Sequence, residues 1–474
     1  MDSKKVGLAG LVAIVFTSMV GSGVYNIPQN MAAEASAGAS LIAWIITGVG
    51  MLFLALTFKL LSDKRPDITS GIYGYAREDL GDYVGFNAAW GYWVSGAVGN
   101  VAFAILLNDA LGFFYPVLKE HGWETIVLCL GMIWFFSFIV MFGVEFATKL
   151  SSYSTIIIMI ALSVILGCLI YAFDWNTFVD SFFGEKYNLP SVGKQIKSTM
   201  MVTLWCFIGI EGAVVISDRA QKKSDVGRAT MIGLVGALFI YSAICLLSFG
   251  IMTQPELSKA VSPSAGSVLK VAVGNWGNEF VNIAVILSLL VSWLAWTVLV
   301  AEVPYAASKD GLLPKFFDRE NRRKAPVSSL VITAILMTIV MGLVFTASDV
   351  YLAAVNIASV MIIPPYVLSS LYLWDGTEKH KLTYKDHKRR IKGLIIGIGG
   401  TFYGVWLLYS AGISYLLMSA IFYFIGIPFY YRAKREHLKS GVHIFNNKER
   451  VLAILIIIAT IVAVSMMLDG KLTT

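Results

Sequence analysis

Long apolar runs separated by short polar connections make up most of the chain. Thirteen such runs occur, each close to or above the roughly 20 residues that an α-helix needs to cross a bilayer. They cover 7–33, 38–61, 83–117, 123–146, 152–173, 198–217, 229–252, 271–306, 327–346, 350–374, 391–410, 412–431 and 451–468. The short segments of alternating polarity that are typical of a membrane β-barrel do not occur. The pattern predicts an all-α polytopic membrane protein with about 13 spans.

The composition agrees with this prediction. Hydrophobic residues make up 57% of the 474 residues, and charged residues only 14%, whereas a soluble domain carries about a quarter. These values exclude a soluble enzyme, a disordered chain and a fibrous protein. The chain also lacks a His-Glu-x-x-His motif, a serine nucleophile elbow and a P-loop. We therefore expect no enzymatic activity, no catalytic residue, no metal and no cofactor.

The positions of the charges predict how the chain crosses the membrane. A net charge of +7 could suit a nucleic-acid partner, but the basic residues cluster in connections beside apolar runs, which is a topology signal. If the N-terminus is cytoplasmic, thirty of the 37 basic residues lie inside and seven lie outside. We expect a plasma (inner) membrane protein whose C-terminus lies outside if there are 13 spans. Its macromolecular environment would be the lipid bilayer, and no nucleic acid is expected.

Two of the predicted spans carry glycines where a helix would be interrupted. The first contains Gly21-Ser22-Gly23 followed by Pro28, and the sixth contains Gly209-Ile210-Glu211-Gly212. Glycine weakens helix propagation, and proline suits the first turn of a second half-helix. Either site alone could simply allow close helix packing. However, the first and sixth spans are equivalent if spans 1–5 and 6–10 are inverted repeats, and paired interruptions are typical of a transporter's central site.

At these interruptions the sequence resembles the amino acid–polyamine–organocation transporters, most closely the basic amino acid/polyamine antiporters. The stretches that carry the resemblance are 21–30 (Gly-Ser-Gly-Val-Tyr-Asn-Ile-Pro-Gln-Asn), 70–75 running on to Gly85-Phe86, 203–212, and 309–314 (Lys-Asp-Gly-Leu-Leu-Pro). The resemblance implies a LeuT-like core at 1–374 built from two inverted repeats, 7–173 and 198–374. Helices 11 and 12 would occupy 391–432, and the further helix at 451–468 departs from the twelve-helix pattern of the best-known members.

The resemblance also implies a function, which is secondary active transport by alternating access. The expected exchange is between a cationic amino acid (arginine, ornithine or lysine) and a related amino acid or polyamine product. Two alternatives stay open, namely amine exchange with an aromatic or histidine-type substrate, and proton-coupled amino acid uptake. In the fifth span no lysine occurs from Ser151 to Phe173, where proton-coupled relatives commonly carry one, and this favours exchange. A homodimer is also left open.

The expected substrate site lies at the interruptions. A half-helix beginning near Ser22 would offer free N–H groups and a positive dipole end to a carboxylate. The resemblance assigns the carboxylate to Ser22 and Gly23, and the amine to the carbonyls before each break. These carbonyls belong to Met19, Trp205 and Ile208.

Further lining residues are expected on the third, eighth and tenth spans. Asn100 is an amide in an apolar span and needs partners, either from the distal end of the substrate or from a neighbouring helix. Trp296 lies in mid-span, where its ring face could attract a cationic side chain, and Trp205 would act as a lid. The remaining candidates are Tyr92, Gly96, Phe103, Asn356 and Ser359.

The resemblance assigns Glu211 a gating or protonation role, and Glu302 is a second candidate for it. A charge in mid-span costs roughly 2.5–3.5 kcal/mol on insertion scales, so Glu211 and Glu302 need a reason to be there. Glu211 could instead cap backbone freed by the break, and Glu302 could reach the membrane surface or pair with a base in a connection. No lysine or arginine lies in mid-span, and acid without base favours cationic solutes.

Overall fold

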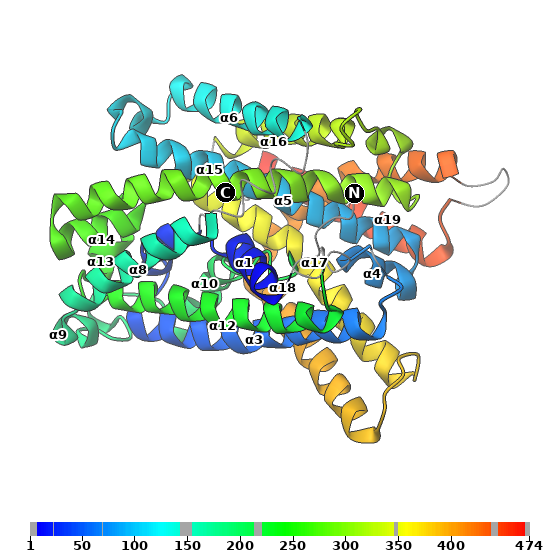
Figure 1. Cartoon of the computed structure of the whole chain (residues 1–474), viewed down its shortest axis with the longest axis horizontal. Helices are drawn as coiled ribbons and strands as arrows, with labels where there is room; N and C mark the ends of the chain where they lie inside the picture. The colour runs from blue at the N-terminus through cyan, green and yellow to red at the C-terminus, as the bar shows by residue number, and fades with distance from the viewer. Residues whose placement is uncertain are drawn as a thin grey trace.

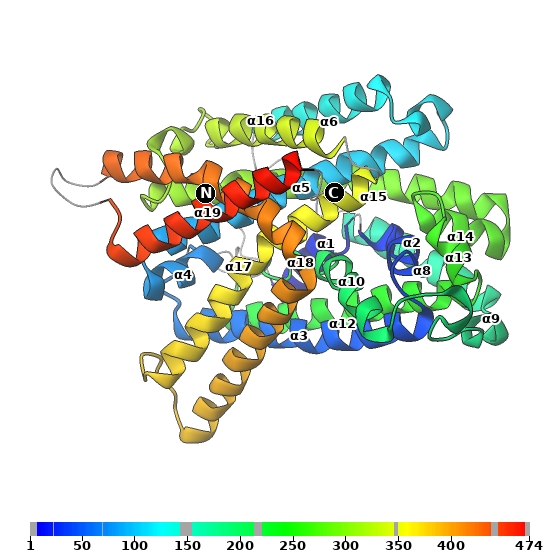
Figure 2. The same cartoon turned by 180° about the vertical axis from the view of Figure 1, so that it is seen from behind.

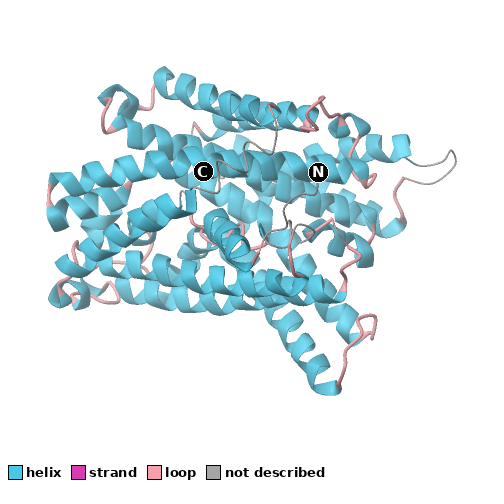
Figure 3. Ribbon diagram, viewed as in Figure 1, coloured by secondary structure: helices cyan, strands magenta, loops and turns pink. Residues whose placement is uncertain are grey.

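The computed structural model describes residues 7–21, 23–68, 70–142, 154–212, 220–345, 349–437 and 444–469. Within these residues every regular element is a helix (Figure 3). Nine of the described helices are long and apolar enough to cross a membrane. They are α3 (Ala37–Lys64), α5 (Asp82–Gly112), α6 (Trp123–Met141), α12 (Lys223–Ser248), α15 (Asn275–Lys309), α16 (Val327–Val344), α17 (Val350–Glu378), α18 (His387–His437) and α19 (Asn447–Leu468). The predicted class, an all-α polytopic membrane protein, is confirmed.

Shorter helices complete the fold. Those that fall in the remaining apolar runs are α1 (Leu8–Met19), α2 (Ile27–Ala32), α8 (Ser154–Ala172) and α10 (Val192–Trp205). The connections contain α4 (Ile72–Leu80), α9 (Trp175–Val179), α13 (Gln254–Ser258), α14 (Ser264–Val273) and the 3₁₀ turns η1 (Gly23–Tyr25), η2 (Pro116–Glu120), η3 (Glu185–Tyr187) and η5 (Lys315–Asp318). In the fifth span, 151–153 lie outside the described residues.

Glycines lie at several helix boundaries, some of which hydropathy alone placed differently. The run 83–117 was expected as one span, but α5 ends at Gly112. The run 271–306 is divided at Gly274, whose φ of 90° separates α14 from α15. Runs 391–410 and 412–431 are joined in α18, which breaks at Gly412 with a φ of 77°. Glycine adopts such positive φ angles without a steric penalty, so Gly274 and Gly412 interrupt otherwise apolar sequence.

The helices pack in layers around a buried centre (Figures 1 and 2). Helices α3 and α12 lie side by side along one side of the molecule, and α6 and α16 lie side by side along the opposite side. Helix α5 runs between these layers in contact with α4, α6, α15 and α17, and nearly all of its residues are buried. Helix α1 lies at the centre against α12, α8 and α15. The hairpin of α17 and α18 projects beyond this body.

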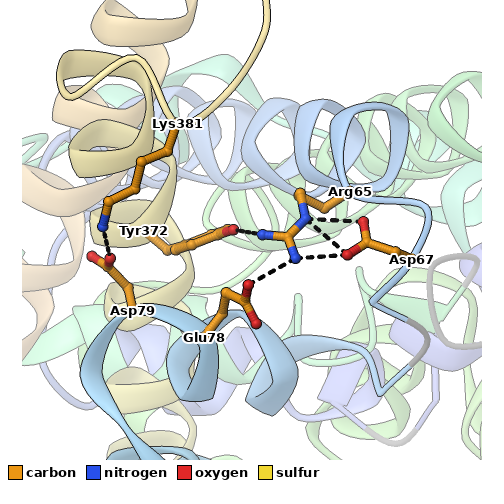
Figure 4. A network of polar contacts seen from close by, with 6 residues as sticks. All are labelled: Arg65, Asp67, Glu78, Asp79, Tyr372 and Lys381. Carbon is orange, nitrogen blue, oxygen red and sulfur yellow. Dashed lines mark hydrogen bonds and ion pairs between the residues drawn. The ribbon is translucent and has the colours of Figure 1, made fainter.

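The connections expected on the cytoplasmic side meet at one end of the molecule. Charged side chains there join α3 and α4 to the end of α17 (Figure 4). Arg77 at the end of α4 also donates to the carbonyl of Asp310, which follows α15 (3.1 Å). Lys434 near the end of α18 pairs with Asp82 at the start of α5. Several of the connections that the basic residues predict to be cytoplasmic therefore lie together at one end of the structure.

Candidate functional site

Both predicted interruptions are present in the structure. Helix α1 ends at Met19, and α2, reached through η1, contains Pro28 in its first turn. Helix α10 ends at Trp205, and turns continue to Glu211. The second break thus opens earlier than its glycines suggested, because the chain leaves the helix four residues before Gly209.

The first break differs from the expectation in its second half. Regular α-helix resumes only at Ile27, after the 3₁₀ turn Gly23–Tyr25. The half-helix expected near Ser22 is therefore a short 3₁₀ turn followed by a six-residue helix, and Ser22 itself lies outside the described residues. Gly23 is buried at the start of this turn.

The two breaks touch each other through Ser18 and Gly209. The Ser18 hydroxyl donates a hydrogen bond of 2.8 Å to the carbonyl of Gly209. Gly209 has a φ of 105°, and a Cβ atom there would lie 2.7 Å from the Ser18 carbonyl oxygen. A larger residue would therefore meet both backbone strain and a backbone clash. This close approach brings the interrupted backbones of α1 and α10 into one place.

A cavity lies beside this junction. The cavity is narrow and partly open, with about 360 Å³ of empty space when its opening to solvent is included. Eight of its lining residues are among those predicted from the sequence, namely Met19, Gly23, Gly96, Asn100, Phe103, Trp205, Ile208 and Trp296. Three more, Ser18, Ser95 and Gly99, were missed. Residues from the two breaks, from α5 and from α15 thus converge on a single cavity.

Small residues allow the Trp205 ring to close against the cavity. A Cβ atom on Gly23 would lie 3.1 Å from that ring, and one on Gly99 would lie 3.0 Å from it. The Phe103 ring meets Trp205 edge to face, with centroids 6.3 Å apart. Gly99 could have been found from its place one turn after Ser95 and Gly96 on the same face of the third span.

Asn100 is the polar group that the protein leaves without a partner at this cavity. Its side chain is 1% exposed, and neither its amide nitrogen nor its oxygen has a hydrogen-bond partner. Buried polar groups are nearly always paired, and leaving one unpaired costs about 1–3 kcal/mol. An unpaired amide on the wall of a cavity therefore marks a place where a ligand can supply the partner.

Trp296 contacts the first break through its indole nitrogen. The Nε1–H group donates to the carbonyl of Ser18 at 3.1 Å. The last carbonyls of a helix lack intrahelical partners, so this bond stabilises the end of α1. The contact was not predicted because the two residues are 278 positions apart. Contact between the ring face and a cationic substrate remains a prediction.

The carbonyl oxygen of Met19 is already in use. It accepts a hydrogen bond from the Tyr241 hydroxyl at 2.8 Å and another from the backbone of Gly21 at 2.8 Å. A carbonyl oxygen has two lone pairs, so a substrate amine would have to displace one of these donors. The Trp205 carbonyl accepts one bond, from the backbone of Ile208 at 3.2 Å, and has a lone pair to spare.

Glu211 joins helices α5 and α17 to the second break. Its carboxylate accepts a hydrogen bond from the Tyr92 hydroxyl of α5 and another from the Tyr366 hydroxyl of α17, each 2.7 Å long. The side chain is 0% exposed. Tyr92 was expected to line the substrate site, but its hydroxyl is directed to this carboxylate instead. Any change in the charge of Glu211 would therefore affect α5, α17 and the second break together.

Three other predicted residues lie outside the cavity wall. Asn356 donates to the Tyr415 hydroxyl at 2.9 Å, and Ser359 donates to the carbonyl of Met201 at 3.0 Å. Their polar groups thus serve helix packing, which sequence periodicity cannot distinguish from ligand binding. Glu302 is half-buried in α15 and does not line the cavity.

The described residues offer no ligand set for a metal. No group of three or more His, Cys, Asp or Glu side chains comes together within them. The four cysteines, Cys129, Cys168, Cys206 and Cys245, are all free thiols.

An ionic network at one end of the molecule was not predicted (Figure 4). Arg65, which follows α3, contacts Asp67 at 2.6 Å and Glu78 of α4 at 2.9 Å, and it also donates to the Tyr372 hydroxyl of α17. Lys381 beyond the end of α17 pairs with Asp79 of α4. These contacts hold the ends of α3, α4 and α17 together. The signal in the sequence was only that charged residues cluster there.

Comparison with known proteins identifies the family. A family model for amino acid permeases matches residues 6–433 of the chain. A protein of Clostridium perfringens, named as a candidate amino-acid transporter, is 42% identical over 477 residues, covering 97% of this chain and 98% of that protein. The arginine/agmatine antiporter of Chlamydia abortus is 41% identical over 443 residues, which cover 92% of this chain and 91% of that protein. The arginine/agmatine antiporter of Chlamydia trachomatis is 40% identical over 471 residues, which cover 98% of this chain and 97% of that protein.

The comparisons also bear on α19. It begins after residue 433 and therefore lies beyond the part matched by the family model. The matches that cover 97% and 98% of this chain leave too few residues unmatched to omit it. The alignments with these relatives therefore extend into the segment 447–468.

Proposed function

The chain belongs to the amino acid permease family, and we propose that it exchanges a cationic amino acid for a related amino acid or amine by alternating access. The observation that carries the proposal is the cavity where the breaks of α1 and α10 meet. The relatives named as arginine/agmatine antiporters suggest arginine and its decarboxylated amine as the first pair to test.

The lining of the cavity suits a substrate with a cationic side chain. No lysine or arginine is among the lining residues, and three of the walls are the aromatic rings of Phe103, Trp205 and Trp296. An ammonium or guanidinium group near such a ring face gains roughly 0.5–2 kcal/mol, depending on its desolvation. Asn100 can offer its carbonyl oxygen to the same group, because that oxygen has no protein partner.

The backbone at the breaks suits the α-amino and α-carboxyl groups. Gly23 lies on the cavity at the start of a short helical turn, and free N–H groups in such a place favour a carboxylate. The Trp205 carbonyl, which accepts one hydrogen bond, can accept another from the amine. We propose Ser22 and Gly23 for the carboxylate and the carbonyls of the second break, at Trp205 and Ile208, for the amine.

Glu211 supplies a means of coupling the site to helix movement. Its two tyrosine partners come from α5, which lines the cavity, and from α17, which reaches the ionic network at the end of the molecule. Protonation of the carboxylate would remove the negative charge that both hydroxyl donors face. We propose that Glu211 acts in gating, and that Glu302 contributes from the part of α15 nearer to the same end.

The proposed architecture follows the two-repeat organisation. Residues 7–173 and 198–374 would form inverted repeats, with α18 and α19 added afterwards. The end that carries the network of Figure 4 would face the cytoplasm, because it collects the connections with most of the basic residues. The plasma membrane is the expected location of this multi-pass protein.

The decisive experiment is counterflow in proteoliposomes. Vesicles preloaded with unlabelled arginine should accumulate labelled arginine or agmatine, and empty vesicles should not. Lysine, ornithine, tyrosine, histidine and leucine would be loaded in parallel to define the substrate class. Equal uptake into empty and preloaded vesicles at matched membrane potential would contradict exchange. Counterflow only with tyrosine or histidine would contradict the cationic substrate and retain exchange.

A further inference from the structure

A second hollow lies at the C-terminal end of α6, where the connection between α15 and α16 packs against it. It is open to the outside, with about 630 Å³ of empty space, and is lined by Phe138, Met141, Phe142, Asn321, Arg322 and Arg323. One wall is thus the apolar end of a candidate membrane span, and the other is a basic turn. An apolar wall beside a basic wall is typical of a site at a membrane surface.

The basic turn is held in a fixed shape. Asn321 accepts hydrogen bonds from the backbones of Arg323 (2.9 Å) and Ala325 (3.0 Å). Its own side-chain amide donates to the carbonyl of Met141 at 2.7 Å. The turn is therefore fastened to the end of α6, and the arginine backbones are positioned before any ligand binds.

The two arginines differ in their contacts with the rest of the protein. The guanidinium of Arg323 donates to the carbonyl of Phe142 at 3.0 Å and lies 5.3 Å from the centre of the Phe142 ring. Arg322 is exposed, and no hydrogen bond or ion pair joins it to any described residue. A guanidinium presents several N–H donors in a plane that matches a phosphate group. One arginine is thus anchored at the hollow, and the other is available to an anion.

The apolar wall is exposed as well. Phe138 is 58% exposed and Phe142 is 50% exposed, and their rings meet edge to face at 4.8 Å. Both lie at the end of an apolar helix, where aromatic side chains commonly mark the boundary between hydrocarbon and headgroups. A ligand that fills this hollow therefore needs an anionic head and an apolar body.

We propose that the hollow binds an anionic phospholipid, with the phosphodiester on Arg322 and Arg323 and the start of an acyl chain on Phe138, Met141 and Phe142. Basic pockets beside transmembrane helices recognise anionic headgroups in this way. The bound lipid bridges α6 to the connection that leads into α16. The inference does not depend on the transported solute, so it stands or falls separately from the proposed exchange.

The test is native mass spectrometry of the full-length protein in mild detergent, titrated with phosphatidylglycerol or phosphatidylcholine of the same chains. The parent protein should retain at least threefold more phosphatidylglycerol than phosphatidylcholine. The double variant Arg322→Gln/Arg323→Gln should lose this preference. The charge-matched control Lys388→Gln/Arg389→Gln, at the start of α18, should keep it. Thermal unfolding in phosphatidylcholine alone should be similar for all three, which separates lipid binding from folding.

Two further arms identify the source of the anion. Phe138→Ser/Phe142→Ser should reduce retention of phosphatidylglycerol while both arginines remain. Inorganic phosphate at millimolar concentration should not displace the lipid. Displacement by phosphate, equal retention of the two lipids by the parent, or an unchanged preference in the arginine variant would each overturn the proposal.

Discussion

The cavity at the helix breaks and the ionic network of Figure 4 treat polar groups in opposite ways. In the cavity, Asn100 is buried and has no partner. In the network, Arg65 is half-buried and contacts two carboxylates and the Tyr372 hydroxyl. The cavity thus contains a polar group that has no partner in the protein, whereas the network contains a charged group that has several partners.

Because of this difference, the two regions are suited to different tasks. An unpaired buried amide raises the energy of the empty protein by about 1–3 kcal/mol, and a ligand that pairs with it recovers that energy. A charge that is already paired gains nothing from a ligand, but it can hold helices together in one conformation. The cavity is thus suited to recognition, and the network is suited to holding the ends of α3, α4 and α17 together.

The largest effect is expected where the walls of the cavity meet. Gly209→Ala would place a Cβ 2.7 Å from the Ser18 carbonyl oxygen at a φ of 105°, with a combined cost of about 2–4 kcal/mol. Exchange in proteoliposomes should fall more than tenfold. Gly193→Ala, in the same segment but with no atom within 4 Å of the added Cβ, should leave exchange unchanged. Parent-like exchange in the Gly209 variant would show that the two breaks do not need this approach.

A smaller effect should separate an unpaired amide from a paired one on the same helix. Asn100→Leu should weaken substrate binding about fivefold or more without lowering thermal stability, because the unpaired amide destabilises the empty protein and its removal relieves that cost. Asn108 is also buried on α5 and its oxygen has no partner, but its amide nitrogen donates to the carbonyl of Leu118 at 3.1 Å. Asn108→Leu should therefore lower stability by about 1 kcal/mol and spare binding. Binding is measured by calorimetry and stability by thermal unfolding. Loss of stability in the Asn100 variant would assign this amide to helix packing.

The smallest effect is expected in the ionic network. Arg65→Gln should lower stability by no more than about 1 kcal/mol at neutral pH, since its partners are partly exposed and such pairs are weak. The hydrogen bond from Arg65 holds the pKa of Asp67 below its usual value. A carboxylate with a lowered pKa stabilises the folded state above its unfolded pKa of about 3.9, and this contribution is lost as the pH falls through the lowered value. The difference between parent and variant should therefore shrink in acid, as thermal unfolding from pH 7 to pH 3 would show.

Much of the fold could be predicted because the bilayer imposes strong local rules. A membrane span must satisfy its backbone internally, so an apolar run of sufficient length becomes a helix whatever surrounds it. The exception was Gly274, whose positive φ angle divides a run that hydropathy treats as single. The break at Gly412 lies where hydropathy already separates two runs. Eight cavity residues could also be predicted. Four of them lie at the two interruptions, and the other four, Gly96, Asn100, Phe103 and Trp296, lie on the third and eighth spans, where the family resemblance places further lining residues.

The sequence by itself determined the helices, their interruptions and the family, since each depends on residues that are close together in the chain. Only the tertiary structure decided what the interrupted segments contact. The Ser18 hydroxyl meets the Gly209 carbonyl across 191 positions, and the Trp296 indole meets the Ser18 carbonyl across 278. It also decided that Tyr92 serves Glu211 and that Asn356 serves Tyr415. A hydroxyl or an amide in a span can bond to a ligand or to another helix at similar energy, so the packing of distant helices, and not the residue type, selects the partner.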